Sequence, residues 1–240
     1  METRESEIVA LPGGAAQVAW RRNARARRVS LRIDARTGMV VVTLPARTGR
    51  RAGLALLTEH AGWVAERLEA LPCAVPFAPG ARVPIDGVEY PACHAPEGRG
   101  GAWIEDGEIV VSGGAAFFAR RLRDFLRAEA RLRLGRRVAA MAARAGVRPS
   151  RLLVKDTLSR WGSCAADRTI ALSWRLVMAP PFVQDYVAAH EVAHLRHMNH
   201  GPAFWALVAR LTPHRAAAQA WLGAQGTRLQ RIGAGSGTVS

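Results

Sequence analysis

The segment His190-Glu191-Val192-Ala193-His194 places two imidazoles and a carboxylate at a spacing that suits metal chemistry. Residues four apart on an α-helix differ by only about 40° around its axis, so both imidazoles would project from one face and reach one ion. Glu191 would stand beside them, where its carboxylate can accept a proton from a water held by the metal. On a helix, this H-E-x-x-H pattern is typical of zinc-dependent hydrolysis.

A third ligand is expected, because a catalytic zinc ion usually has three protein ligands and keeps its fourth position for water or substrate. The chain contains no Asp or Glu after Glu191, so this ligand should be a histidine. His200 is favoured, because Gly201-Pro202 can break the helix there and turn the chain back toward the ion. His197 is the alternative. It shares the face of the other two histidines, but closing on the same ion would require the helix to bend.

The chemistry expected of such a site is attack by an activated water. Zinc would lower the pKa of a bound water toward about 7 and polarise the target carbonyl or phosphoryl oxygen. Glu191 would take the proton and return it to the leaving group. Arg160, Arg175 and Tyr186 are candidates for stabilising the developing oxyanion. His197, if it is not a ligand, is a candidate for contacting the substrate.

The flanking sequence predicts the elements that would position these residues. Pro180-Pro181 can open a helix, because proline is favoured in a first helical turn. Short apolar runs bounded by turn-forming residues predict strands. The expected elements are strands at Leu152–Lys155 and Thr169–Trp174, a loop between them at Ser159–Cys164, and helices at Pro180–Met198 and Gly201–Leu211.

The first half of the chain is predicted to be rich in β-structure, and together with the later helices this predicts an α+β fold. We expect an N-terminal β-rich lobe with one helix over about residues 21–114, a helical lobe over about 115–230, and a flexible tail over 231–240. The expected elements are a hairpin of Val29–Ile33 with Val40–Thr43, a helix capped by Thr48 that runs to Leu71 with Trp63 in the core, a second β-region over 72–114, and a long amphipathic helix over Ala115–Ala145 ended by Gly146.

Composition limits the class of protein. The formal net charge is +15, almost all of it from arginine, and such a field attracts nucleotides, nucleic acid or acidic peptides, although no nucleic-acid-binding motif accompanies it. Cys73, Cys93 and Cys164 are too few and too scattered for a disulfide framework. The chain has no apolar stretch long enough to span a bilayer and no secretory start, so we expect a cytoplasmic protein without a membrane partner.

Several segments together resemble the YgjP-like metallopeptidase-domain family. The resemblance covers about Arg21 to Gln230 and departs from the family pattern at Gly201, where a serine is expected. Metal binding should survive this change, because glycine is accepted before a helix. The segments are Asp156–Cys164, Trp174-Arg175, His190–His194 and Asn199–Trp205, with weaker support from the basic Arg21–Arg28 and from Gly62-Trp63.

The resemblance implies a minimal zincin, with an active-site helix against an antiparallel sheet and zinc held by the three histidines. Because three histidines already complete the site, we expect Cys164 to be packed or to contact a ligand rather than to bind the metal. Likeness to SprT-type proteases implies a peptidase, in which the strand Thr169–Trp174 would hold an extended peptide by edge pairing. A member described as a UTP pyrophosphatase implies a nucleoside triphosphate instead, which Arg160 and the basic segment would suit. A third alternative is a nucleic-acid or protein binding module with structural zinc. Glu191 and an open coordination position argue against it.

Overall fold

The computed structural model describes residues 5–157 and 160–234, and within them the chain divides into two compact units. Unit 1 comprises residues 5–74 with Ala234, and unit 2 comprises Val75–Gly233. The sequence places the border between its lobes near residue 114. The border between the two units instead falls after residue 74 in the sequence. The second β-region belongs to unit 2 because it shares one core with the later helices: Val83 and Ile109 lie in the same cluster as Leu122.

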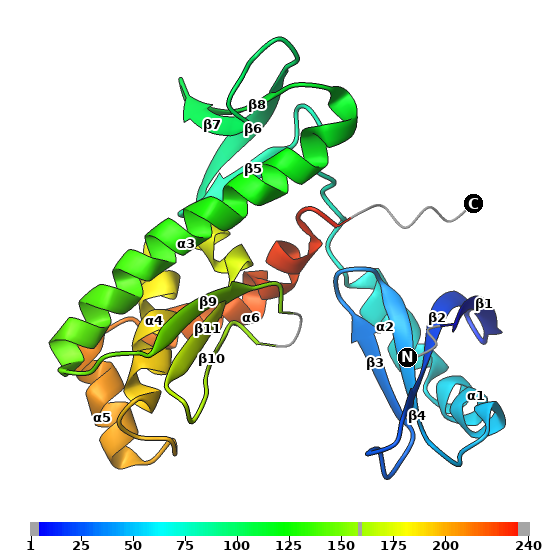
Figure 1. The fold of residues 1–240 in the computed structure, drawn as a ribbon. Helices are drawn as coiled ribbons and strands as arrows, with labels where there is room; N and C mark the ends of the chain where they lie inside the picture. Colours follow the sequence, from blue (N-terminus) through cyan, green and yellow to red (C-terminus); the bar gives the residue numbers. More distant parts are fainter. Residues whose placement is uncertain (1–4, 158–159, 235–240) are drawn as a thin grey trace. The chain divides into compact units, whose positions relative to one another are not determined.

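Unit 1 is a four-stranded sheet with two helices (Figure 1). The strand order is β1-β2-β4-β3, with β2 and β4 parallel and the other pairs antiparallel. The expected hairpin is confirmed as β3 and β4, and two further strands precede Arg21. The elements are β1 (Glu5–Leu11), β2 (Gly14–Asn23), β3 (Ser30–Asp34), β4 (Met39–Pro45), α1 (Arg50–Glu59) and α2 (Ala61–Glu69).

The helix expected in unit 1 differs from the prediction in three respects. It begins after Gly49 without a side-chain cap from Thr48, and it is interrupted at His60 to give α1 and α2. Trp63 is 41% exposed rather than in the core, because α2 buries Ala61 and Val64 instead. Its ring lines a surface groove of about 450 Å³.

The first half of unit 2 is a second four-stranded sheet of order β5-β6-β8-β7, followed by the long helix α3. The prediction of that helix is confirmed, and Gly146 ends it in the left-handed conformation, with φ of 63°. The Gly146 N–H donates to carbonyls of the last turn, those of Ala142 and Ala143. The elements are β5 (Arg82–Ile85), β6 (Val88–Ala95), β7 (Ala102–Glu105), β8 (Glu108–Ser112), η1 (Ala115–Phe117) and α3 (Phe118–Ala145).

A three-stranded sheet of order β10-β11-β9 lies beside the last helices of unit 2 (Figure 1). Its strands are β9 (Arg151–Lys155), β10 (Gly162–Cys164) and β11 (Thr169–Ser173). The expectation of an antiparallel sheet is wrong for one pair: β10 and β11 are antiparallel, but β11 and β9 are parallel. Part of the segment that was expected to be a loop forms β10. Because β10 and β11 form an antiparallel hairpin, β11 runs in the same direction as β9. Ser159 lies outside the described residues.

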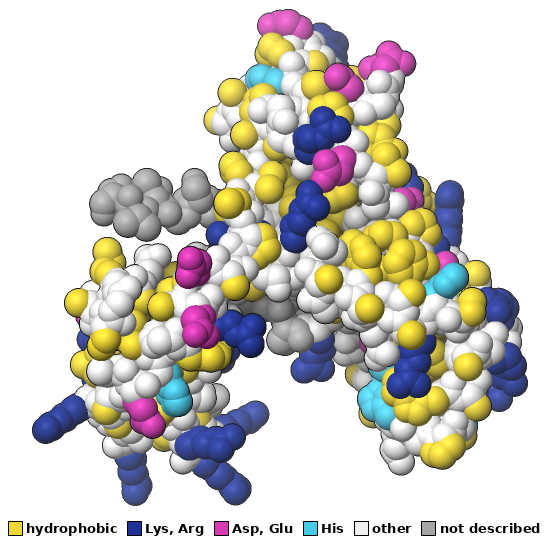
Figure 2. Space-filling view, turned by 180° about the vertical axis from the view of Figure 1, so that it is seen from behind, with side chains coloured by type: hydrophobic (Ala, Val, Ile, Leu, Met, Phe, Trp, Pro, Cys, Tyr) yellow, Lys and Arg dark blue, Asp and Glu magenta, His cyan; other side chains and the backbone are white. Residues whose placement is uncertain are grey.

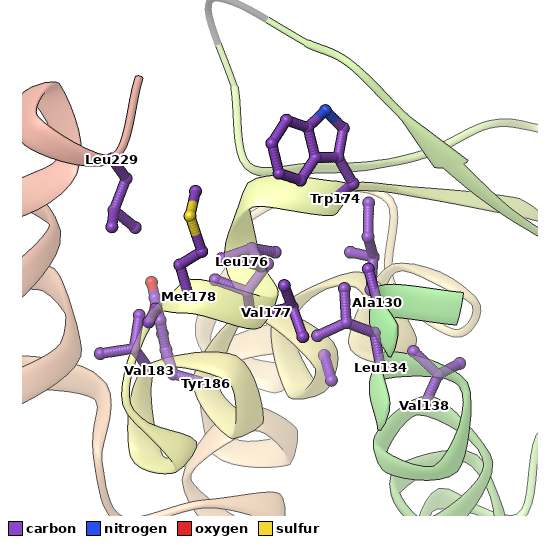
Figure 3. Packing of buried hydrophobic residues seen from close by; sticks show 14 of the residues in the cluster. Ala130, Leu134, Val138, Trp174, Leu176, Val177, Met178, Val183, Tyr186 and Leu229 are labelled. Atoms are coloured by element: carbon purple, nitrogen blue, oxygen red, sulfur yellow. The ribbon is translucent and has the colours of Figure 1, made fainter. Parts of the chain in front are cut away.

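The remaining helices are η2 (Trp174–Met178), α4 (Pro181–His194), α5 (Pro202–Leu211) and α6 (Arg215–Arg231). Of these, η2, α4 and α5 pack against α3, and α6 packs against α4 and η2. Helix α4 ends four residues before the expected Met198, with a tight last turn in which the Leu195 N–H donates to the Val192 carbonyl at 3.0 Å. Helix α6 was not predicted as a separate element. Figure 3 shows the common core, formed by Ala130, Leu134 and Val138 of α3, Leu176, Val177 and Met178 of η2, Val183 and Tyr186 of α4, and Leu229 of α6.

The α+β class is confirmed by this arrangement. The expected tail begins too early, because Ile232 is buried and pairs with Val75; Gly235–Ser240 lie outside the described residues. Among the described residues, no helix combines the length and apolar character that crossing a membrane requires.

Candidate metal centre

Helix α4 and the turn that follows it bring three histidines together. His190 and His194 lie one helical turn apart on the same face, and His200 returns to them after the helix has ended. One ring nitrogen from each lies within 4.8 Å of the other two. His197 is not part of this group, so among the described residues the structure brings His200, rather than His197, together with the other two histidines.

The ring orientations point Nε2 atoms at a common centre. The His194 Nδ1 lies 3.2 Å from the His197 carbonyl oxygen, and since a carbonyl can only accept, Nδ1 carries the proton and Nε2 keeps its lone pair. The Nε2 atoms of His190 and His200 are 3.2 Å apart. His197 therefore contributes through its backbone, by fixing the ring of a ligand.

Aromatic side chains enclose the histidines. The rings of all three lie within 5.0 Å of Phe204, measured between centroids, and the Trp205 ring is stacked on His200 at 5.6 Å. Burial lowers the pKa of His190 to about 4, helped by the positive charge of His194, His200 and Arg215. Burial also lowers the pKa of His194. Neutral imidazole is the form that binds metal, so the surroundings favour the ligand state.

Glu191 lies against the strand β10 and is only 5% exposed. Gly162 makes this approach possible: a Cβ atom there would stand 2.6 Å from the Glu191 Cγ and would also overlap a carboxylate oxygen. Burial raises the pKa of Glu191 to about 7, and the positive charge of Arg160 opposes this rise. The glycine of the Arg-Trp-Gly-Ser-Cys segment is therefore the surface on which the carboxylate rests.

The donor set fits a transition metal ion. Three convergent imidazole nitrogens without a carboxylate ligand are typical of zinc and of neighbouring metals. The His190 Nδ1 is buried and has no hydrogen-bond partner within the described part of the chain, so on that side the ring is held by packing.

Comparison with models of protein families shows which family the chain belongs to. The model of the YgjP-like, metallopeptidase domain family matches residues 27–225. The chain belongs to this family. No curated protein sequence matches it. Among solved structures, the YgjP-like chain is similar to the crystal structure of the metallopeptidase zymogen of Pyrococcus abyssi abylysin, at 20% identity and a TM-score of 0.35, over 41% of this chain and 97% of that chain.

Arg160 and Tyr186, two of the candidate oxyanion-stabilising residues, lie close to the YgjP-like metal centre. Arg160 is exposed, and its charge acts on Glu191. The Tyr186 ring lies 5.9 Å from that of His190, but its hydroxyl bonds to the Gln219 side chain. Burial is the main reason that the pKa of Tyr186 is raised.

Arg175 lies elsewhere. It is 2% exposed, stacks on Trp174 at 4.4 Å, and donates to the backbone carbonyls of Leu229 and Ile232 at the end of α6. Its side chain also reaches Asp156 at 3.5 Å. Arg175 therefore holds the fold of the YgjP-like unit, and the structure does not support its expected place in the site.

Two residues beside the centre were missed by the sequence analysis. Gly162 was read only as part of a loop, and Arg215 was not considered. The Arg215 guanidinium lies 3.4 Å from the centroid of the Trp205 ring. No sequence signal could have placed it there, because its position depends on α6 folding back. Cys164 is half-buried, and burial followed by the charge of Glu191 raises the pKa of its thiol, which suits a packed residue.

Proposed function

We propose that this YgjP-like protein is a zinc-dependent peptidase in which Glu191 is the general base. The observation that carries the proposal is the convergence of three imidazole nitrogens within 4.8 Å, next to a buried carboxylate that follows the first ligand in sequence. A site of this kind leaves one side of the ion open, which is typical of catalytic rather than structural zinc.

His190, His194 and His200 would hold the ion. Zinc bound there would supply a Lewis acid that polarises the scissile carbonyl and acidifies the attacking water. Glu191 takes the proton from the water on its carboxylate and delivers it to the amine as the peptide bond breaks. Gly162 keeps that carboxylate in place, and the His197 carbonyl keeps the His194 ring in the correct tautomer.

An extended peptide would pair with β10. The strand β11, which the sequence favours for this role, is the central strand and already has partners on both sides, so it offers no edge. The strand β10 is the outer strand of the sheet as described, and it carries the glycine that contacts Glu191. Backbone pairing at this edge would bring a substrate carbonyl beside the general base without requiring a particular side chain.

A nucleoside triphosphate remains the second candidate substrate, favoured by the exposed Arg160 beside Glu191, since a guanidinium matches phosphate geometry. The net charge of +15 also suits a nucleic acid or protein binding module with structural zinc. That alternative gives no role to the buried Glu191 carboxylate.

The test compares the zinc-loaded wild type with Glu191→Gln on an unfolded protein and on UTP. The substitution should lower peptide hydrolysis by about 10²–10⁴-fold, because it removes general base catalysis, while zinc content stays at wild-type level. Chelation of the metal should abolish the same activity. Glu66→Gln, an exposed position in unit 1 with the same change of charge, is the control and should retain full activity.

Hydrolysis of UTP that disappears in Glu191→Gln, with no peptide cleavage, would transfer the proposal to the pyrophosphatase. Absence of turnover on both substrates, with zinc still bound, would support the binding module.

A further inference from the structure

Arg215 extends the ring stack of the metal centre toward solvent. It is the first residue of α6, and its guanidinium carbon lies 3.4 Å from the centroid of the Trp205 ring. The Trp205 ring in turn is stacked on His200, at an angle of 28° between the ring planes. One aromatic ring therefore separates this cation from a metal ligand. On the face of unit 2 that Figure 2 presents, histidine side chains adjoin Lys or Arg side chains and hydrophobic side chains.

Within the part of the chain that the structure describes, no carboxylate neutralises the charge of Arg215. Several other arginines of unit 2 are paired; Arg137, for example, contacts Asp185 at 2.6 Å. Arg215 forms no ion pair with any described residue, and the chain has no Asp or Glu after Glu191. The anion that this position can bind must come from a ligand.

Stacking also determines how the guanidinium can bind. The face of the group is used against Trp205, which leaves the N–H donors at its edge free and holds them in one plane. A planar set of donors matches the two oxygens of a carboxylate. A lysine would supply charge at this position but would not supply the plane.

We propose that Arg215 is a specificity residue that selects peptides with a carboxylate beside the bond to be cleaved. This inference rests on the proposed peptidase function. The carboxylate has two sources, an acidic side chain next to the scissile bond or the free C-terminus of a short peptide. Both offer the same pair of oxygens to the guanidinium.

The cleavage test uses peptide pairs that differ only in charge, an Asp peptide against its Asn counterpart and a free C-terminus against an amide. Arg215→Gln should lower kcat/KM on the preferred acidic peptide by about tenfold or more, mainly through KM, because a charged hydrogen-bonded pair is lost. Cleavage of the neutral peptide should be unchanged. Arg215→Lys should recover part of the loss. Arg210→Gln, an exposed arginine of α5 with the same change of charge, should behave as wild type.

A second readout does not depend on turnover. Calorimetry with the zinc-loaded Glu191→Gln protein should show binding of the acidic peptide, and adding Arg215→Gln should weaken that binding about tenfold or more. Zinc stoichiometry and thermal midpoint should not change, because the Arg215 side chain is exposed. The pair in which charge matters identifies the source of the carboxylate.

Zinc-dependent cleavage that is equally fast on charged and neutral peptides, with or without Arg215, overturns the inference and leaves the peptidase standing. Arg215-dependent binding of acidic peptides without zinc-dependent cleavage removes the peptidase and, with it, the role of Arg215 in cleavage specificity, and leaves Arg215 as a carboxylate-binding residue only. Dependence on Arg215 that appears with UTP alone shows that the anion is a phosphate, and it overturns the proposal for peptides.

Discussion

Units 1 and 2 each contain a glycine on which a large side chain rests, and the two differ in what that side chain is. In unit 1, a Cβ atom at Gly53 would stand 2.6 Å from the Trp20 ring and 3.0 Å from Leu44. In unit 2, a Cβ atom at Gly162 would overlap the side chain of Glu191. The first glycine preserves apolar packing, whereas the second preserves the position of a carboxylate.

The two cores differ in the same way. The core of unit 1 is made of apolar residues, and the described residues of that unit include no buried polar side chain. The described residues of unit 2 include seven: Ser112, Ser173, Arg175, Gln184, Glu191, Thr212 and Gln230. Burying a charge costs free energy unless it is paired, so each buried charge of unit 2 requires a reason. Arg175 is matched by backbone carbonyls and Asp156. Glu191 is packed against Gly162 of β10, and among the described residues the only charge that favours its ionised form is that of Arg160.

The largest effect on the free energy of unfolding is expected at Arg175, whose buried charge stabilises the fold of unit 2. Arg175→Ala removes the partner of Asp156 and of two backbone carbonyls, and it should lower the free energy of unfolding by about 3–5 kcal/mol. Chemical denaturation followed by tryptophan fluorescence measures this. Below the unfolding transition, kcat should be retained. If Arg175→Ala kept its stability and lost kcat, Arg175 would have to be assigned to the active site after all.

A slightly smaller effect should come from an apolar truncation confined to unit 1. Leu57 is fully buried in the core of that unit, and Leu57→Ala should cost about 2–5 kcal/mol. Because the two cores share no residue, calorimetry should show a change in the unit 1 transition while zinc-dependent turnover is kept. Leu134→Ala, its counterpart in unit 2, should lower the temperature at which turnover is lost. Equal loss of turnover in both variants would contradict the separation of the cores.

The smallest effect in free energy is the most local. Gly162→Ala should displace Glu191 and lower kcat by about 10²-fold, with zinc content unchanged, because misplacement of a reacting group by about 1 Å costs that much. Gly53→Ala should instead cost about 1–3 kcal/mol of stability, through overpacking, and leave kcat as in the wild type. Steady-state kinetics and denaturation on both variants would show whether Gly162→Ala loses kcat and Gly53→Ala loses stability. If Gly162→Ala lost only stability, the comparison between the two glycines would fail.

The sequence predicts the candidate site well where the functional residues lie on one helix and their spacing matches the helical repeat. His190, Glu191 and His194 lie on one helix, so their relation follows from helical geometry. The lack of Asp and Glu after Glu191 predicts a histidine as the third ligand, and the break at Gly201-Pro202 favours His200 over His197. The long helix ended by Gly146 is equally local. Family membership also follows from segments such as Arg160–Cys164, whose residue types are uncommon in combination.

What was missed depends on contacts between distant segments. Trp63 has an apolar side chain, but the phase of α2 is set by Ala61 and Val64, which leaves the ring outside. Arg175 was read as a site residue because nothing local indicates that the end of α6 needs a donor. Arg215 was overlooked for the same reason. Such placements are decided by tertiary packing and cannot be deduced from spacing.

The closure of unit 2 by its own last residues has a consequence for synthesis. The Val75 N–H donates to the Arg231 carbonyl at 3.1 Å, and the Gly233 N–H donates to the Val75 carbonyl at 2.7 Å, so the first and last residues of the unit pair. While the chain is being translated, unit 1 can collapse on contacts that are already present, but unit 2 must wait for α6. A nascent chain that carries the three histidines still lacks Arg215 and the anchor for Arg175. The completed site therefore forms after translation has passed Gly233, which delays any hydrolytic activity until the unit can fold as a whole.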